Sequence, residues 1–87
     1  MNWDGFEKHC IDLKLPLLVI KGTRGVLACG YLNVETFNKT GETAAIVSGV
    51  RTFDDMLTAK VVTCSAAAGQ AGIKSGMSGS EVLELIR

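Results

Sequence analysis

Residues 16–50 read PLLVIKGTRGVLACGYLNVETFNKTGETAAIVSGV, and this stretch decides the fold. It begins with two apolar runs, Leu17–Ile20 and Val26–Leu32, on either side of a turn that contains two glycines. Apolar runs without strict alternation are typical of strands that are covered on both faces. Glycines supply the positive φ angles of a tight reversal. The stretch therefore predicts an antiparallel hairpin in the middle of a sheet, with Pro16 opening its first strand.

A short helix is predicted after the hairpin, at about residues 34–40. Asn33 is a favourable N-cap, and Gly41 suits the left-handed position just past a helix end. An apolar strand over Thr43–Val50 follows. The remaining predicted elements are an edge strand with a bulge over Phe6–Leu13, a helix capped by Thr52, a strand over Lys60–Cys64, a helix capped by Ser65, and a final helix at about 79–86 whose capping box begins at Ser78.

The order of these elements predicts an α+β fold in a single domain, residues 1–87. The first three strands follow one another closely and are expected to be antiparallel neighbours. The last three strands are joined by short helices, so we expect parallel crossovers between them. The result is a mixed five-stranded sheet with three or four short helices packed against it.

The composition limits the partners that this chain can have. Hydrophobic residues make up 47% of the chain and charged residues 21%, which is more apolar surface than a small monomer usually hides, so we expect a homo-oligomer. Nine basic residues balance nine acidic ones without a basic stripe, which argues against nucleic acid. No apolar run reaches the roughly 18 residues that span a membrane, and no signal peptide is visible. A cytoplasmic protein is the expectation.

The cysteines and the histidine do not predict a metal site or a cofactor. Cys10, Cys29 and Cys64 are far apart in sequence, no CxxC pair occurs, and His9 is the single histidine. A structural zinc site needs about four such ligands at short spacings. Cys29 and Cys64 lie in apolar runs, where a buried and inert thiol is the simplest interpretation. Reduced cysteines are consistent with the cytoplasm.

Several segments resemble a known family. The chain is similar to the YunC-like family, domain of unknown function 1805, and the resemblance covers nearly everything after about residue 11. It implies an α+β fold of about this size and implies no activity. The segments that carry it are PLLVIK at 16–21, LACGYLN at 27–33, AAIVSGVRT at 44–52 and GIKSGMSG at 72–79.

The best candidate site lies where strands end and helices begin. Ligands bind beyond the carboxyl ends of parallel strands, and helix N-termini there favour anions. Arg51 adds a planar donor group that suits a carboxylate or phosphate. The alternative is that Arg51 pairs with Asp54, Asp55 or an acid of another subunit. The candidate ligand-binding residues are Cys29, Asn33, Arg51, Thr52, Cys64 and Ser65.

Two functions remain open from the sequence. The first is a small oligomeric binding or interaction module with a small-anion pocket. The second is a small-molecule enzyme in which Arg51 orients an acidic substrate and Cys64 or Cys29 reacts. The inventory of acid–base groups is thin, which favours the binding module. The Gly22–Gly25 segment lacks the spacing of a phosphate-binding loop and predicts only the hairpin turn.

Overall fold

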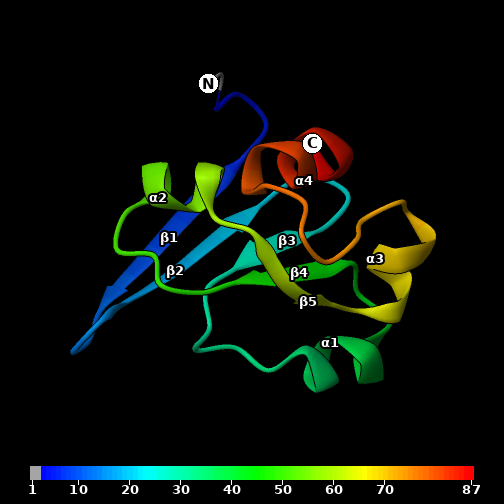
Figure 1. Ribbon diagram of the computed structural model, residues 1–87, viewed down its shortest axis with the longest axis horizontal. Helices are drawn as coiled ribbons and strands as arrows, with labels where there is room; N and C mark the ends of the chain where they lie inside the picture. Colours follow the sequence, from blue (N-terminus) through cyan, green and yellow to red (C-terminus); the bar gives the residue numbers. More distant parts are fainter. Residues whose placement is uncertain (1–2) are drawn as a thin grey trace.

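The computed structural model describes residues 3–87, which form one mixed five-stranded sheet with short helices packed against it (Figure 1). The fold is therefore α+β, as predicted. The elements are β1 (Glu7–Asp12), β2 (Pro16–Lys21), β3 (Val26–Ala28), α1 (Val34–Thr40), β4 (Ala44–Val47), α2 (Phe53–Thr58), β5 (Val61–Cys64), α3 (Ala66–Gln70) and α4 (Gly79–Ile86).

The strands lie side by side in their order along the chain, β1-β2-β3-β4-β5. The pairs β1–β2 and β2–β3 are antiparallel, and β3–β4 is parallel through the α1 crossover, as predicted. The prediction of a parallel β4–β5 pair is wrong, because these strands are antiparallel. The six residues of α2 rise only about 9 Å, and α2 packs on α4 instead of running back along β4.

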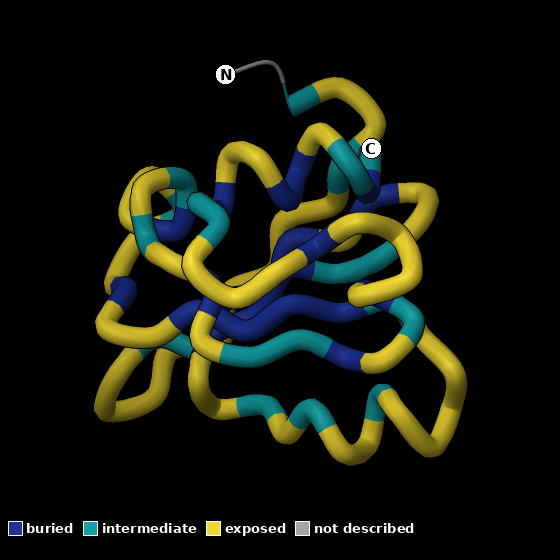
Figure 2. Tube along the Cα trace, turned by 45° about the vertical axis from the view of Figure 1, so that its right-hand side comes forward, coloured by how far each residue is buried: buried dark blue, intermediate teal, exposed yellow. Residues whose placement is uncertain are grey.

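The core lies mainly between the sheet and the α2–α4 side, while α1 lies on the opposite side of the sheet (Figure 1). All four residues of β4 are buried, so this strand is an inner one, as predicted. Figure 2 shows the buried segments at the centre of the molecule and α1 as a largely exposed helix. The second hairpin strand is shorter than predicted: it ends at Ala28, and residues 29–33 form a turn in which Leu32 N donates to Cys29 O.

Strand β1 is an edge strand, as predicted, and every one of its residues is exposed. The predicted bulge is absent from β1, since the register runs without interruption from Glu7 opposite Lys21 to Asp12 opposite Pro16. The register shifts instead in the β4–β5 pair, between Ile46 and Val47 of β4.

Side-chain caps explain where the helices begin. The predicted caps Asn33, Thr52, Ser65 and Ser78 each accept a hydrogen bond from a backbone N–H of the first turn. At α4 the capping box is complete, because Glu81 in turn accepts from Ser78 N. No helix within residues 3–87 has the length and apolar character that crossing a membrane requires.

Candidate functional site

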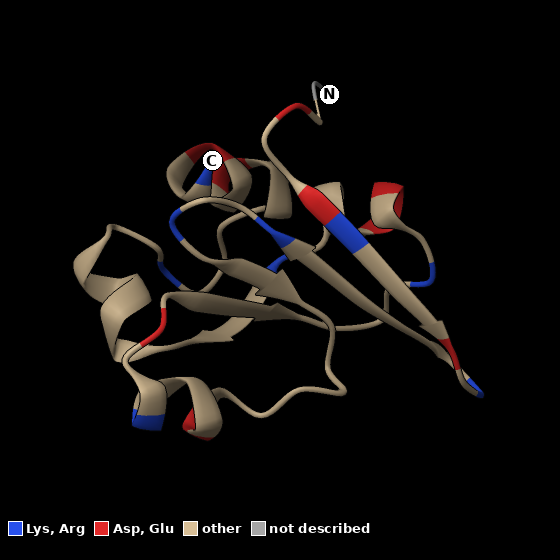
Figure 3. Ribbon diagram, turned by 180° about the vertical axis from the view of Figure 1, so that it is seen from behind, with Lys and Arg blue, Asp and Glu red and all other residues tan. Residues whose placement is uncertain are grey.

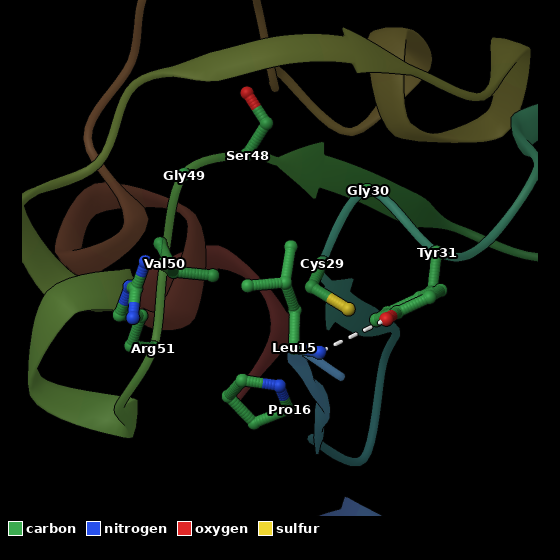
Figure 4. A pocket seen from close by; sticks show the side chains of 9 residues that line it. All are labelled: Leu15, Pro16, Cys29, Gly30, Tyr31, Ser48, Gly49, Val50 and Arg51. Atoms are coloured by element: carbon green, nitrogen blue, oxygen red, sulfur yellow. Dashed lines mark hydrogen bonds between the residues drawn. The ribbon is translucent and has the colours of Figure 1, made fainter. Parts of the chain in front are cut away.

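A pocket of about 400 Å³ opens at one end of the sheet (Figure 4). Its walls come from the segments Leu15–Pro16, Cys29–Tyr31 and Ser48–Arg51. Figure 4 shows Arg51 on one side and Tyr31 on the other, with Leu15 and Pro16 between them. The pocket therefore combines apolar side chains with one guanidinium and one phenol.

The strand directions place these segments together. Because β3 and β4 are parallel, the residues that follow them meet at the same end of the sheet. The start of β2 lies there too, because β2 is antiparallel to β3. Gly49 has a φ angle of 73°, in the left-handed region that glycine adopts readily, and it turns the chain from β4 toward α2. The residues that follow β3 and β4 thus lie together around this pocket, at the strand ends where the sequence predicts a site.

Two hydrogen bonds hold the wall of the pocket. The Tyr31 hydroxyl accepts from Leu15 N at 3.2 Å, which ties the turn after β3 to the start of the hairpin. Cys29 Sγ accepts from Leu18 N at 3.3 Å, and Cys29 is only 4% exposed. The Cys29 thiol is therefore a packed wall group with a backbone partner.

Arg51 is exposed at the rim of the pocket. Its backbone N donates to Asp55 Oδ2 at 3.0 Å, whereas its guanidinium takes part in none of the ion pairs found within residues 3–87. The alternative that Arg51 pairs with Asp54 or Asp55 of its own chain is therefore not seen. Arg51 is a cation beside a pocket, without an acidic partner in the part of the chain that the structure describes.

Asn33 and Thr52 do not line the pocket. Asn33 Oδ1 accepts from Glu35 N at 2.9 Å, and Thr52 Oγ1 accepts from Asp55 N at 3.0 Å. Each side chain thus serves its own helix as a cap. One backbone N–H at the start of each of these helices is therefore already bonded to its cap. Arg51 is the cationic residue among those that line the pocket.

Cys64 and Ser65 lie at the opposite end of the sheet, because β5 is antiparallel to β4. Ser65 is 1% exposed, and its hydroxyl donates to Glu42 O at 2.8 Å while accepting from Ala44 N and Ala68 N. Cys64 Sγ lies 3.7 Å from the Ile73 carbonyl oxygen. The prediction that three strand ends converge is therefore wrong for this one.

Sequence reasoning misses three segments of the pocket wall: Leu15–Pro16, Gly30–Tyr31 and Ser48–Val50. The apolar pattern places Tyr31 in a strand, which would bury it in the sheet. Gly30, next to Tyr31, and Gly49 are the available signals, since a glycine at the end of an apolar run often marks a turn.

The other sequence candidates have structural explanations. Gly22 N donates to Gly25 O at 2.8 Å, which closes the predicted hairpin turn. His9 is exposed on β1 and does not line the pocket. Within residues 3–87, no three His, Cys, Asp or Glu side chains gather in a way that could hold a metal ion.

Comparisons with known proteins agree with this architecture. Residues 28–86 match the family described as "Domain of unknown function (DUF1805)". The chain is similar to "Uncharacterized protein YunC" of Bacillus subtilis (strain 168), with 36% identity over 87 residues, 92% of this chain and 86% of YunC. It is also similar to the crystal structure of TA1206, a protein of unknown function from Thermoplasma acidophilum, with a TM-score of 0.83, 39% identity and coverage of 94% and 93% of the two chains. The resemblance seen in the sequence is confirmed, and the chain belongs to the YunC-like DUF1805 family.

Proposed function

We propose that this chain is a small cytoplasmic binding module, assembled as a homo-oligomer, that holds a small anionic ligand with an apolar portion in the pocket between Leu15 and Arg51. The observation that carries the proposal is the Arg51 guanidinium, which borders a pocket and has no acidic partner within residues 3–87.

The chemistry of the walls supports this class of ligand. A guanidinium presents a planar pair of donors that matches a carboxylate or a phosphate. The side chains of Leu15, Pro16 and Val50 offer apolar contact beside it. A volume of about 400 Å³ is within the range of small-molecule sites. A ligand with one anionic group and a compact apolar body would use both parts of the pocket.

The enzyme alternative has one observation in its favour, namely that Cys29 and Arg51 line the same pocket. Activation of a thiol needs a neighbouring base or a similar device. Among residues 3–87, no histidine and no carboxylate lines the pocket, and Cys29 Sγ already accepts from Leu18 N. Binding without catalysis is therefore the better supported function.

Assembly into a homo-oligomer is supported by large apolar side chains on the surface. These side chains are between 46% and 59% exposed. Contact of apolar side chains with water is unfavourable, and a partner surface that covered them would remove this contact. The free thiols suit a reducing compartment. The exposed side chains are Ile11, Leu13, Leu15, Tyr31 and Val62.

The test is a thermal-shift titration with inorganic phosphate, sulfate and benzoate at constant ionic strength. A ligand that binds only the folded state raises Tm as its concentration passes Kd. We expect Arg51→Ala to abolish this rise. The matched control is Arg24→Ala, which removes the same charge from the β2–β3 turn, beside a second hollow lined by residues 21–26 and 41–43.

The two variants separate the possible sites. The proposal is supported if the anions no longer raise Tm in Arg51→Ala but still raise it in Arg24→Ala. An unchanged rise in Arg51→Ala, or a loss confined to Arg24→Ala, would remove the proposed site. No rise with any of the three anions would also count against an anion pocket.

A further inference from the structure

The outer edge of β1 is an open edge of the sheet. Within residues 3–87 it pairs only with β2, and its six residues are exposed on both faces. It contains no proline and no bulge, which are two of the usual means of blocking an edge; Glu7, Lys8 and Asp12 are charged side chains along it. The backbone N–H and C=O groups along this edge have no strand partner within residues 3–87, so a further strand could pair with them.

The hydrogen bonds of β2 show which backbone groups of β1 point outward. Cys29 N donates to Leu18 O, so the backbone groups of Leu18 face β3. Backbone groups alternate in direction along an antiparallel strand, so those of Val19 face β1, where its partner is His9. The groups that remain for a partner at the outer edge belong to the residues that alternate with His9, namely Lys8, Cys10 and Asp12.

We propose that β1 of one copy pairs antiparallel with β1 of a second copy about a two-fold axis at Cys10. Lys8 of each copy then lies opposite Asp12 of the other, and the two sheets join edge to edge. This inference specifies the contact surface of the oligomer proposed above and does not depend on the pocket.

Charge complementarity selects this register. Cross-strand pairs of opposite charge are stabilising, and like charges placed opposite each other are destabilising. An axis at Cys10 gives two Lys8–Asp12 pairs, whereas an axis at Ile11 sets Lys8 against Lys14, and an axis at His9 sets Asp12 against Phe6. Phe6 N is also already bonded to Trp3 O.

The charges that would pair are not used by ion pairs within residues 3–87. Lys8 Nζ lies over the rings of Trp3 and Phe53, at 4.6 Å and 5.5 Å, and Asp12 Oδ1 lies 3.9 Å from Cys10 Sγ. Lys8 lies near the start of β1 and Asp12 at its end. Figure 3 shows basic and acidic colour toward these two ends of the strand. On the other face, Ile11 is 56% exposed and would lie opposite His9 of the second copy.

The first test compares two variants at the proposed axis by light scattering after size-exclusion chromatography. Cys10→Pro removes an N–H that points away from β2, so the β1–β2 ladder keeps its bonds while the new ladder loses them. Cys10→Val removes the thiol and keeps the N–H. We expect dimers for the natural chain and Cys10→Val, and a folded monomer for Cys10→Pro, with folding checked by circular dichroism.

A charge swap gives a second test that does not use proline. Lys8→Asp and Asp12→Lys should each weaken the dimer by about tenfold or more, because both cross-strand pairs become repulsive. Combining the two changes restores opposite charges and should restore the dimer.

The outcomes separate this proposal from the proposed function. A dimer that survives Cys10→Pro, or a double swap that fails to rescue dimerisation, overturns pairing at β1 and leaves the oligomer in place. A natural chain that is monomeric at micromolar concentration overturns both this contact and the homo-oligomer. The anion titration of Arg51→Ala is independent of these results.

Discussion

The Ser65 hydroxyl donates a hydrogen bond to the Glu42 carbonyl oxygen at 2.8 Å, which joins the end of β5 to the residues before β4. Ala44 N donates to the same hydroxyl at 3.0 Å. These two bonds hold the Cys64–Ser65 corner at the end of the sheet opposite the pocket. They explain why a residue that the sequence placed in the site has a structural role.

We expect Ser65→Ala to lower the free energy of unfolding by about 2–3 kcal/mol, because it leaves buried donors and an acceptor without partners. Urea denaturation measures this loss. The control is Ser75→Ala, an exposed hydroxyl with a 3.4 Å contact, for which a change of about 0.5 kcal/mol or less is expected. Equal effects of the two changes would contradict the structural role of Ser65.

The contact between α4 and α2 leaves no room for a side chain at Gly79. A Cβ at Gly79 would overlap the carbonyl oxygen of Met56, and Gly79 N donates to Ala59 O at 2.9 Å. Gly79→Ala should therefore force α4 away from α2 and destabilise the fold by about 2–3 kcal/mol.

Gly69 provides the matched control for Gly79. It lies in α3, and a Cβ at this position would have no neighbouring atom within 4 Å. Gly69→Ala should therefore stabilise the fold by about 0.5–1 kcal/mol through helix propensity and a less flexible unfolded chain. Both variants are compared by urea denaturation. A stabilising Gly79→Ala change would show that the two helices are not packed so closely.

The three thiols should differ in their rates of modification in the folded protein. Cys10 is exposed, Cys64 is half-buried and Cys29 is buried, so alkylation at pH 6 should modify Cys10 first and Cys29 only as fast as the protein unfolds. Mass spectrometry of the digested protein assigns each site. In denaturant all three should react at similar rates.

Rapid alkylation of Cys29 in the folded protein would favour the enzyme alternative. The Cys10→Ser variant makes this comparison cleaner, because it removes the most exposed thiol. If Cys29 is alkylated no faster than the protein unfolds, the hypothesis of a reactive thiol in the pocket is contradicted.

The capping box of α4 predicts a pH dependence of stability. The pKa of the Glu81 carboxyl is lowered from 4.5, first by the hydrogen bond from Ser78 N and second by the one from the Ser78 hydroxyl. A carboxyl whose pKa is lower in the folded state contributes stability above its unfolded pKa and loses it as the pH falls through the folded value. The contribution of Glu81 should therefore disappear progressively below pH 4.5.

Urea denaturation over a pH series, from neutral to acid, checks this prediction with Glu81→Gln. The variant should be less stable than the natural chain at neutral pH, and the difference should shrink below pH 4.5. Glu84→Gln removes the same charge from the same helix without touching the capping box, and the effect of losing its exposed ion pair with Arg87, at 3.3 Å, is expected to be small. A Glu81→Gln difference that does not change with pH would contradict the mechanism.

Local signals explain why the helices and the hairpin are predictable. Asn33 and Ser78 cap their helices with hydrogen bonds to residues two or three positions away, so the sequence contains both partners. The apolar runs that begin at Leu17 and Ala44 form inner strands for the same reason, since their neighbours along the chain already define a buried element.

The pocket is only half predictable. Arg51 and Cys29 are expected in a common site and do line it, because β3 and β4 are parallel. The place of Tyr31 in the pocket is not predicted, because the apolar run that begins at Val26 does not indicate where strand pairing stops. That end is set by the turn bond from Leu32 N to Cys29 O, a contact that competes with further pairing.

The sequence by itself determined the elements of this protein, its edge strand and the positions of its helix caps, because each depends on residues that are close along the chain. Only the tertiary structure decided the direction of β5, and with it the separation of Cys64 and Ser65 from Arg51. The physical reason is that α2 packs on α4, whose residues lie more than 20 positions later in the chain. Burial between segments so far apart has no signature in either segment alone.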